Sequence, residues 1–173
     1  AASGFSAGFI VCVHRHRPVE EALQLLEEIE PWKGRVIGVG MGRPEVGYPP
    51  GRFASFFARA RRRGYRTTVH AGEEGPASYV DEALRLLDPD RIDHGVAACR
   101  SDVLTRELAE RKIPLTICPL SNVRLKVVPS REAHPLKAML RSGVRVSVHS
   151  DDPPYFGGYV NANYLSCQTA LGL

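Results

Sequence analysis

Short apolar runs alternate along the chain with longer segments whose apolar residues recur at helical spacing. The apolar runs predict six strands, at residues 8–14, 35–40, 65–70, 91–96, 113–119 and 144–149. The segments between them predict helices at residues 18–30, 50–64, 76–88, 101–112 and 134–143. Strands that alternate with helices in this way are typical of a parallel sheet with crossover helices, so we expect an α/β fold.

The residues that flank the predicted helices support these boundaries. Pro18 suits the first turn of a helix, where its missing N–H costs nothing. Ser101 is a good N-cap for the segment that follows it, because its hydroxyl can accept a bond from a free backbone N–H. Gly64 and Gly143 stand where two helices should stop.

Polar side chains gather at the points where the predicted strands end. They are His14, Arg15, His16, His70, Glu73, Asp93, His94, Cys118, Ser121, Asn122, His149, Ser150, Asp151 and Asp152. A (β/α) barrel builds its site at that face from several strands, whereas an open doubly wound sheet concentrates its ligand contacts at one switch point. A complete barrel has eight strands. With six predicted here, either two units are missing or the fold is not a barrel.

Five of these residues have the chemistry of a metal-assisted hydrolytic site. Imidazole and carboxylate groups, as in His70, His94 and Asp151, are suitable ligands for Zn²⁺, which makes hydroxide available near neutral pH. Glu73 would act as a general acid or base if burial raises its pKa. Adjacent aspartates point in different directions on an extended segment, so Asp152 is free to contact a substrate.

Each of these residues also has a simpler interpretation. A single His at a strand end is more often an ordinary buried or hydrogen-bonded residue than a ligand. The run SDDPP at residues 150–154 fits a turn or a helix cap, and HAGEEG at 70–75 fits a polar loop. Their joint occurrence at three strand ends favours a functional site.

Four motifs resemble the adenosine/adenine deaminase family of the amidohydrolase superfamily. They are TVHAGEEG at 68–75, RIDHGV at 91–96, ICPLSN at 117–122 and SVHSDDPPYFGGYVNANY at 147–164. The motifs occur in the family's order, the resemblance extends from about Gly8 to Tyr164, and it is closer to the adenine deaminase branch. It implies a TIM-type (β/α)8 metal-dependent hydrolase barrel, of which this chain covers about strands 3–8, with residues 1–173 as a single partial barrel domain.

The resemblance also implies a reaction and a role for each site residue. The reaction is the zinc-dependent deamination of a 6-aminopurine, adenine to hypoxanthine plus ammonia, with Fe²⁺ as the alternative metal. His70 and Asp151 match the family's metal ligands. Glu73 matches the residue that passes a proton to purine N1, and His94 the residue that orients the attacking hydroxide. Asp152 matches the residue that hydrogen-bonds purine N7.

Three features depart from the family pattern. His14 and His16 look like the His-x-His metal pair of the family's first strand, but the surrounding sequence better resembles its third strand. Gly42-Arg43-Pro44 replaces an Asp-Ser-Ser-like run near the purine, and His149 replaces a usual Asn. The alternatives are therefore an adenosine or N6-modified adenine deaminase, or a catalytically silent deaminase-like protein. We expect the isolated 173-residue chain to bind zinc poorly and to be inactive.

Composition and charge give no sign of a nucleic acid or membrane partner, and the resemblance implies a small-molecule purine substrate. The net charge of +4 owes much to an arginine run at residues 59–66, but no aromatic residues interleave it as a single-strand binding platform would require. We interpret the run as a helix end whose cations complement the helix dipole, and expect no nucleic acid partner. The sequence contains no run of about 18 apolar residues, so we expect no membrane span. The four cysteines form no CxxC pair, and we expect reduced thiols in a cytoplasmic protein.

Overall fold

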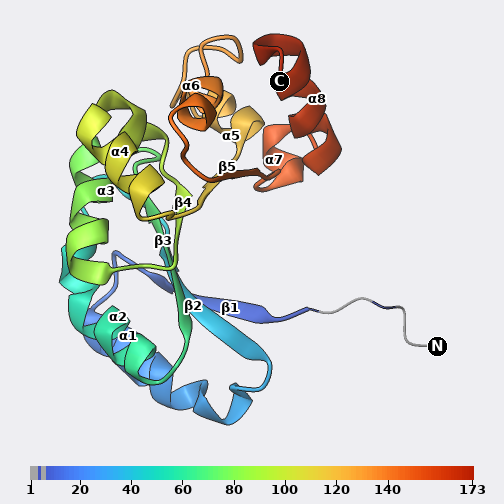
Figure 1. The fold of residues 1–173 in the computed structure, drawn as a ribbon. Helices are drawn as coiled ribbons and strands as arrows, with labels where there is room; N and C mark the ends of the chain where they lie inside the picture. Colours follow the sequence, from blue (N-terminus) through green and yellow to red (C-terminus); the bar gives the residue numbers. More distant parts are fainter. Residues whose placement is uncertain (1–3, 5–6) are drawn as a thin grey trace.

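Six parallel strands pair side by side in the order in which they follow one another along the chain (Figure 1). The computed structural model describes residue 4 and residues 7–173. The strands are β1 (Phe9–His14), β2 (Val36–Gly42), β3 (Arg66–Ala71), β4 (Arg91–His94), β5 (Leu115–Ile117) and β6 (Val146–Val148). All five pairings between neighbouring strands are parallel. The predicted α/β class and the six strands are therefore confirmed.

Helices α1 to α4 lie along one side of the sheet, and α5 to α8 gather beyond β5 and β6 (Figure 1). The α-helices are α1 (Val19–Glu28), α2 (Ala54–Arg62), α3 (Ala77–Glu82), α4 (Asp102–Glu110), α5 (Pro119–Arg124), α6 (Leu136–Arg141), α7 (Pro153–Phe156) and α8 (Val160–Leu171). Short turns of other helix types are η1 (Glu30–Trp32), η2 (Pro50–Phe53), η3 (Ala83–Leu87) and η4 (Val96–Arg100). This arrangement places the crossover connections on the outside of the curved sheet, as in a barrel.

Three α-helices, α5, α7 and α8, were not predicted from the sequence. Helix α5 begins directly after β5 with Pro119 at its first position, inside a stretch that was interpreted only as a strand-end motif. Helix α8 has no clear apolar stripe, and within it the buried residues are the polar Asn163 and Ser166 together with Cys167. The hydrophobic pattern therefore gave no helical signal, and tertiary contacts decide this helix.

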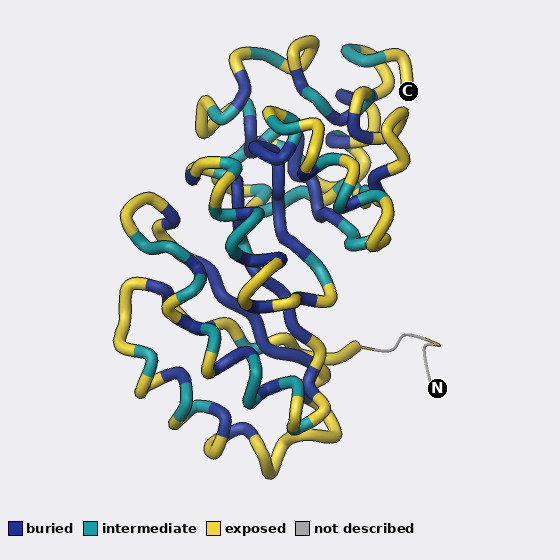
Figure 2. The backbone as a smooth tube through the Cα atoms, turned by 60° about the vertical axis from the view of Figure 1, so that its left-hand side comes forward, coloured by how far each residue is buried: buried dark blue, intermediate teal, exposed yellow. Residues whose placement is uncertain are grey.

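The core lies between the sheet and helices α1 to α4. Outward-facing strand residues such as Val39, Val69 and Ile92 are fully buried. They meet Phe56 and Phe57, whose rings pack edge to face with centroids 5.2 Å apart. Figure 2 shows the strands as the buried layer, with exposed positions concentrated on the loops and outer helix surfaces. This one-sided packing leaves the opposite face of the sheet free for polar residues.

The concave face of the sheet carries a polar network centred on Asp93 of β4. Its carboxylate accepts hydrogen bonds from the Thr68 hydroxyl at 2.6 Å and the Thr116 hydroxyl at 2.8 Å. The Arg91 guanidinium donates to the same carboxylate at 2.9 Å. These side chains share a face because alternate residues of a strand point to the same side. The network lies directly below the strand ends that carry the predicted site.

The arginine run ends helix α2 as predicted. Arg63 donates to the Glu27 carboxylate at 2.6 and 2.7 Å, and Arg59 pairs with Glu27 at 2.8 Å. Arg61 donates to the carbonyl of Leu87. Gly64 then takes a positive φ of 81°, which favours glycine at a helix end. Three of these cations thus have partners inside the chain.

Among the residues that the structure describes, no helix combines the length and the hydrophobicity needed to cross a membrane.

Candidate active site

All five predicted site residues line one cavity of about 630 Å³ at the C-terminal ends of the strands. His70 comes from the end of β3, Glu73 from the loop after it, and His94 from the end of β4. Asp151 and Asp152 follow β6. The parallel arrangement explains this convergence, because the C-terminal ends of all six strands lie at one edge of the sheet.

The imidazole of His70 has the Asp93 carboxylate behind it, close by but not hydrogen-bonded in this geometry. Its Nδ1 atom lies 3.4 Å from Asp93 Oδ2, which leaves Nε2 as the nitrogen available to a ligand. Burial alone would raise the pKa of Asp93, but His70, Arg91 and two threonine hydroxyls together lower it. A carboxylate behind an imidazole is the usual support for a metal-binding His. The surroundings of His70 therefore fit a metal ligand.

Glu73 and His94 form a buried pair in which both groups are uncharged at neutral pH. Glu73 Oε1 lies 3.2 Å from His94 Nδ1, and the two side chains are 14% and 5% exposed. Burial, followed by the negative charges of Asp151 and Glu45, raises the pKa of Glu73 to about 8. Burial, followed by the neighbouring His70, lowers the pKa of His94 to about 4. Glu73 is thus a carboxylic acid able to donate a proton, and His94 is a neutral imidazole.

The opposite pKa shifts of Glu73 and His94 give a testable dependence of stability on pH. Folded Glu73 keeps its proton up to about pH 8, whereas an unfolded Glu loses it near 4.3. The folded state therefore binds more protons in this window, and the Glu73 contribution to stability falls as pH rises. His94 acts in the opposite sense between about pH 4 and 6.5, because there the unfolded state binds more protons.

We expect Glu73→Gln to become progressively more stable than the parent, in the metal-free protein, between pH 6.5 and 8. The difference should grow by at most about 1.4 kcal/mol per pH unit, the limit for one proton. Urea unfolding of both proteins at several pH values measures it. Glu74→Gln, at the exposed neighbouring position, is the control and should follow the parent curve. A pH-independent difference for Glu73→Gln would contradict the raised pKa.

Asp151 and His94 both adopt backbone conformations that favour glycine. Their φ angles are 57° and 63°, in the left-handed region. Such residues cost of order 1–3 kcal/mol each and persist only where the surrounding structure holds them. The Asp151 carboxylate is fixed by a hydrogen bond from the Ser121 hydroxyl at 2.7 Å. Asp152 stands next to it as the residue before helix α7.

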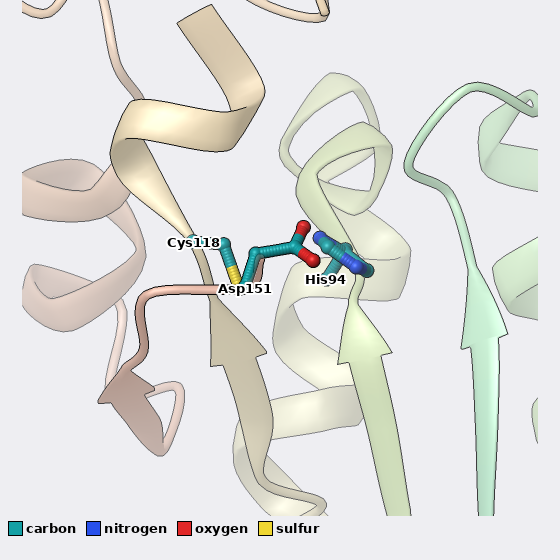
Figure 3. A group of neighbouring side chains, drawn as sticks. All are labelled: His94, Cys118 and Asp151. Atoms are coloured by element: carbon teal, nitrogen blue, oxygen red, sulfur yellow. The ribbon is translucent and has the colours of Figure 1, made fainter. Parts of the chain in front are cut away.

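Among the described residues, His94, Cys118 and Asp151 form a group of three side chains spaced closely enough to hold a metal ion. The ligand atoms of these three residues all lie within 4.8 Å of one another. Figure 3 shows the Asp151 carboxylate directed toward the His94 ring, with the Cys118 sulfur beside Asp151. Burial raises the pKa of the Cys118 thiol, so this thiol is protonated in the metal-free protein. Cys118 belongs to the motif ICPLSN, but the sequence did not predict it as a site residue.

The donor set fits a divalent metal such as zinc. Imidazole, carboxylate and thiol groups are all zinc ligands, and His70 adds a further imidazole whose ring centroid lies 5.0 Å from that of His94. Three buried atoms of the site, His70 Nδ1, Glu73 Oε1 and His94 Nδ1, make no hydrogen bond of good geometry within the described chain. Unpaired buried polar atoms are costly and are common where a site takes a ligand.

The departures from the family pattern lie on or next to the cavity. Arg43 lines it and its Nε atom lies 3.4 Å from His14 Nε2. His149 lies on the concave face, where its Nε2 atom is 2.7 Å from the Ser147 hydroxyl. Burial, followed by the Arg91 charge, lowers the pKa of His149. Arg43 thus forms part of the cavity wall, and His149 is held by Ser147 of β6.

Two buried charged residues beside the site were not predicted from the sequence. Arg15 is fully buried and donates to the backbone carbonyl of His70. Glu45 is 3% exposed and accepts backbone hydrogen bonds from the loop that carries Glu73. Neither belongs to a motif whose chemistry suggests such a role, because each is a single charged residue far along the chain from its partner.

The six parallel strands, with crossover helices on their outer side, form part of a TIM-type barrel fold. The His, Glu and Asp side chains at the C-terminal ends of these strands are typical of the metal-dependent hydrolase class of that fold. A model of the adenosine deaminase family matches residues 1–173. The chain belongs to this family.

Comparisons with individual proteins agree with the family. The chain is 58% identical over 170 residues to an adenine deaminase of Rhodopseudomonas palustris, covering 98% of this chain and 50% of that protein. It is 52% identical over 169 residues to an adenine deaminase of Cupriavidus necator, covering 98% and 48%. The chain thus spans about half the length of the curated relatives it matches.

Solved structures show the same fold. The crystal structure of an adenine deaminase from Arthrobacter aurescens matches with a TM-score of 0.93 and 42% identity, covering 98% of this chain and 52% of that one. An amidohydrolase from Burkhoderia ambifaria with bound Zn matches with a TM-score of 0.88 and 28% identity, covering 98% and 48%. The first similarity supports the barrel fold, and the second, to a structure with bound Zn, supports a metal site.

Proposed function

We propose that the protein containing this chain catalyses the zinc-dependent hydrolytic deamination of adenine to hypoxanthine and ammonia. The observation that carries the proposal is the buried pair of Glu73 and His94, 3.2 Å apart, at the wall of a cavity shared with His70 and Asp151. The relatives named adenine deaminase, at 58% and 52% identity, support adenine as the substrate. We further propose that residues 1–173 form one part of a single (β/α)8 barrel domain.

In this proposal His70 and Asp151 hold the metal. The relative with bound Zn supports zinc, and Fe²⁺ is the alternative. A bound zinc ion would supply hydroxide by lowering the pKa of water. The Ser121 hydroxyl fixes the Asp151 carboxylate, and the Asp93 carboxylate lies 3.4 Å behind His70, where it can accept a hydrogen bond from Nδ1 once Nε2 holds a metal.

The other proposed roles follow from the protonation states of the site. Glu73, protonated below about pH 8, donates its proton to purine N1 and so removes the negative charge that attack at C6 would build on the ring. His94 is neutral and presents an imidazole nitrogen that orients the attacking oxygen. Asp152 hydrogen-bonds purine N7 and fixes the ring in the cavity. The C6 amino group takes the proton of the newly formed C6 hydroxyl and leaves as ammonia, and the proton that the attacking water gave up restores the Glu73 carboxylic acid.

Arg43 favours a second candidate substrate. Its guanidinium lines the same cavity as Glu73 and Asp152 and contacts His14 at 3.4 Å. This cation is placed to contact a polar substituent on the purine. The second candidate function is therefore the deamination of adenosine or of an N6-modified adenine.

Ammonia release from a panel of substrates tests the proposal. The zinc-loaded protein that contains this chain is assayed with adenine, adenosine and N6-methyladenine, and we expect the highest kcat/KM with adenine. Preference for adenosine or N6-methyladenine would support the second candidate. Absence of ammonia or methylamine with all three would contradict deamination and favour a catalytically silent protein.

A further inference from the structure

The buried carboxylate of Glu45 is surrounded by backbone N–H groups of the loop that carries Glu73. Glu45 follows β2 and is 3% exposed. Its Oε2 atom accepts hydrogen bonds from the N–H groups of Glu73, Glu74 and Gly75, each at 2.9 Å. Its Oε1 atom accepts a further bond from Gly72. One side chain thus binds four consecutive backbone amides.

This arrangement is specific to a carboxylate at this position. Successive N–H groups in a turn converge to form a small anion-binding concavity, and a charged acceptor makes stronger bonds to it than a neutral one. The fit is close, because a Cβ atom added at Gly75 would lie 2.7 Å from the Glu45 carboxylate. Gly72 has a φ of 73°, so the turn also requires glycine where the chain leaves β3.

A second buried charge holds the other end of the same loop. Arg15, which follows β1, is fully buried and donates to the carbonyl of His70. Its guanidinium also donates to the carbonyl of Tyr48 at 3.4 Å. The Arg15 guanidinium therefore holds the carbonyl at the start of the loop, and the Glu45 carboxylate holds the N–H groups of residues 72–75. Its conformation depends on side chains from β1 and β2 rather than on its own sequence alone.

We propose that Glu45 is a positioning residue, whose carboxylate fixes the backbone of residues 72–75 and so holds the Glu73 side chain against His94. This inference rests on the proposed function, because it assigns Glu45 to the proton-transfer step of that reaction. Catalytic geometry is sensitive to small displacements, and a shift of about 1 Å can cost about 10²-fold in rate. Glu45 itself does not touch the substrate in this proposal.

The test is Glu45→Gln in the zinc-loaded protein that contains this chain. A Gln carbonyl in the place of Oε2 keeps three of the four bonds, while its NH2 group faces the N–H of Gly72. We expect kcat to fall by about 10- to 100-fold, as for other groups that orient a catalytic side chain, with KM within about threefold of the parent and the zinc content unchanged.

Asp90→Asn is the matched control. Asp90 Oδ2 accepts the backbone N–H of Thr67 at 2.8 Å, at the opposite end of β3 from the Glu73 loop. Asp90→Asn, like Glu45→Gln, replaces a carboxylate that binds backbone N–H groups of β3 or its loop by a neutral amide. It therefore controls for a general loss of stability caused by such a replacement. We expect its kcat to stay within about threefold of the parent. An equal fall of kcat in both variants would overturn the positioning role.

Amide hydrogen exchange supplies a readout that does not depend on activity. In Glu45→Gln the N–H groups of residues 72–75 should exchange at least about tenfold faster than in the parent, because Gly72 loses its acceptor and the other three bonds lose the charge that strengthens them. In Asp90→Asn they should not. Gly75→Ala is a second variant, for use if Glu45→Gln does not fold. Its new Cβ atom would lie 2.7 Å from both the Glu45 carboxylate and Cδ2 of Tyr79, so it disturbs the carboxylate contact without removing the charge. We expect the same fall in kcat and the same faster exchange.

The outcomes separate this inference from the proposed function. If the parent releases ammonia and Glu45→Gln has the parent kcat, the positioning role is wrong and the proposed function stands. If the parent deaminates none of the tested purines, the proposed function is wrong. Unchanged exchange at residues 72–75 in both Glu45→Gln and Gly75→Ala would overturn the structural basis of the inference in either case.

Discussion

Replacing Glu73 by Gln should lower kcat by about 10²- to 10⁴-fold while leaving the bound metal in place. Gln has the shape of Glu but no acidic proton, and burial keeps Glu73 protonated up to about pH 8. The proposed donor to purine N1 is therefore lost without a change in the size of the side chain. Metal content should be unaffected, because Glu73 is not one of the proposed ligands.

Steady-state kinetics and metal analysis on the same preparation check this expectation. Glu74→Gln is the control, because Glu74 is the neighbouring carboxylate and is exposed. We expect Glu74→Gln to keep kcat within about threefold of the parent. A Glu73→Gln protein as active as the parent would refute the proton-transfer role, and one that loses its metal would show that Glu73 supports the metal site instead.

The 173-residue chain by itself should bind zinc weakly and show no measurable turnover. A catalytic zinc site usually has three protein ligands, and the proposed ligands among the described residues are two, His70 and Asp151. Within the described residues, β1 and β6 each pair with one strand only, so the concave face is open to water at both edges. Water raises the local dielectric constant and weakens the attraction between a metal ion and the Asp151 carboxylate.

Equilibrium dialysis against zinc and an ammonia assay on the purified chain measure this result. The adenine deaminase of Rhodopseudomonas palustris, of which this chain matches about half, is the positive control, and we expect it to hold about one zinc per chain. A 173-residue chain that holds one zinc and deaminates adenine would contradict the prediction. In that case Cys118→Ser identifies the site, because loss of zinc in this variant would show that His94, Cys118 and Asp151 bind the metal.

The positions of the strands and the convergence of the site could be predicted from the sequence. Both depend on local patterns, namely short apolar runs and the polar residues that follow them. Once the strands are parallel, their C-terminal ends must lie at one edge, so His70, His94 and Asp151 come together without further information. Helix α8 could not be predicted in this way, because its buried residues are largely polar.

Only the tertiary structure shows how the site residues are held and charged. The partners of Glu45 lie 27 to 30 residues further along the chain, and Arg15 reaches a carbonyl 55 residues away. The pKa of Glu73 depends on burial and on Asp151 and Glu45, which reach it from other strands. Desolvation and the distance between charges are set by packing among distant segments. The sequence alone therefore determined that the predicted residues at the strand ends come together, and the fold decided their protonation, their orientation and their support by Arg15 and Glu45.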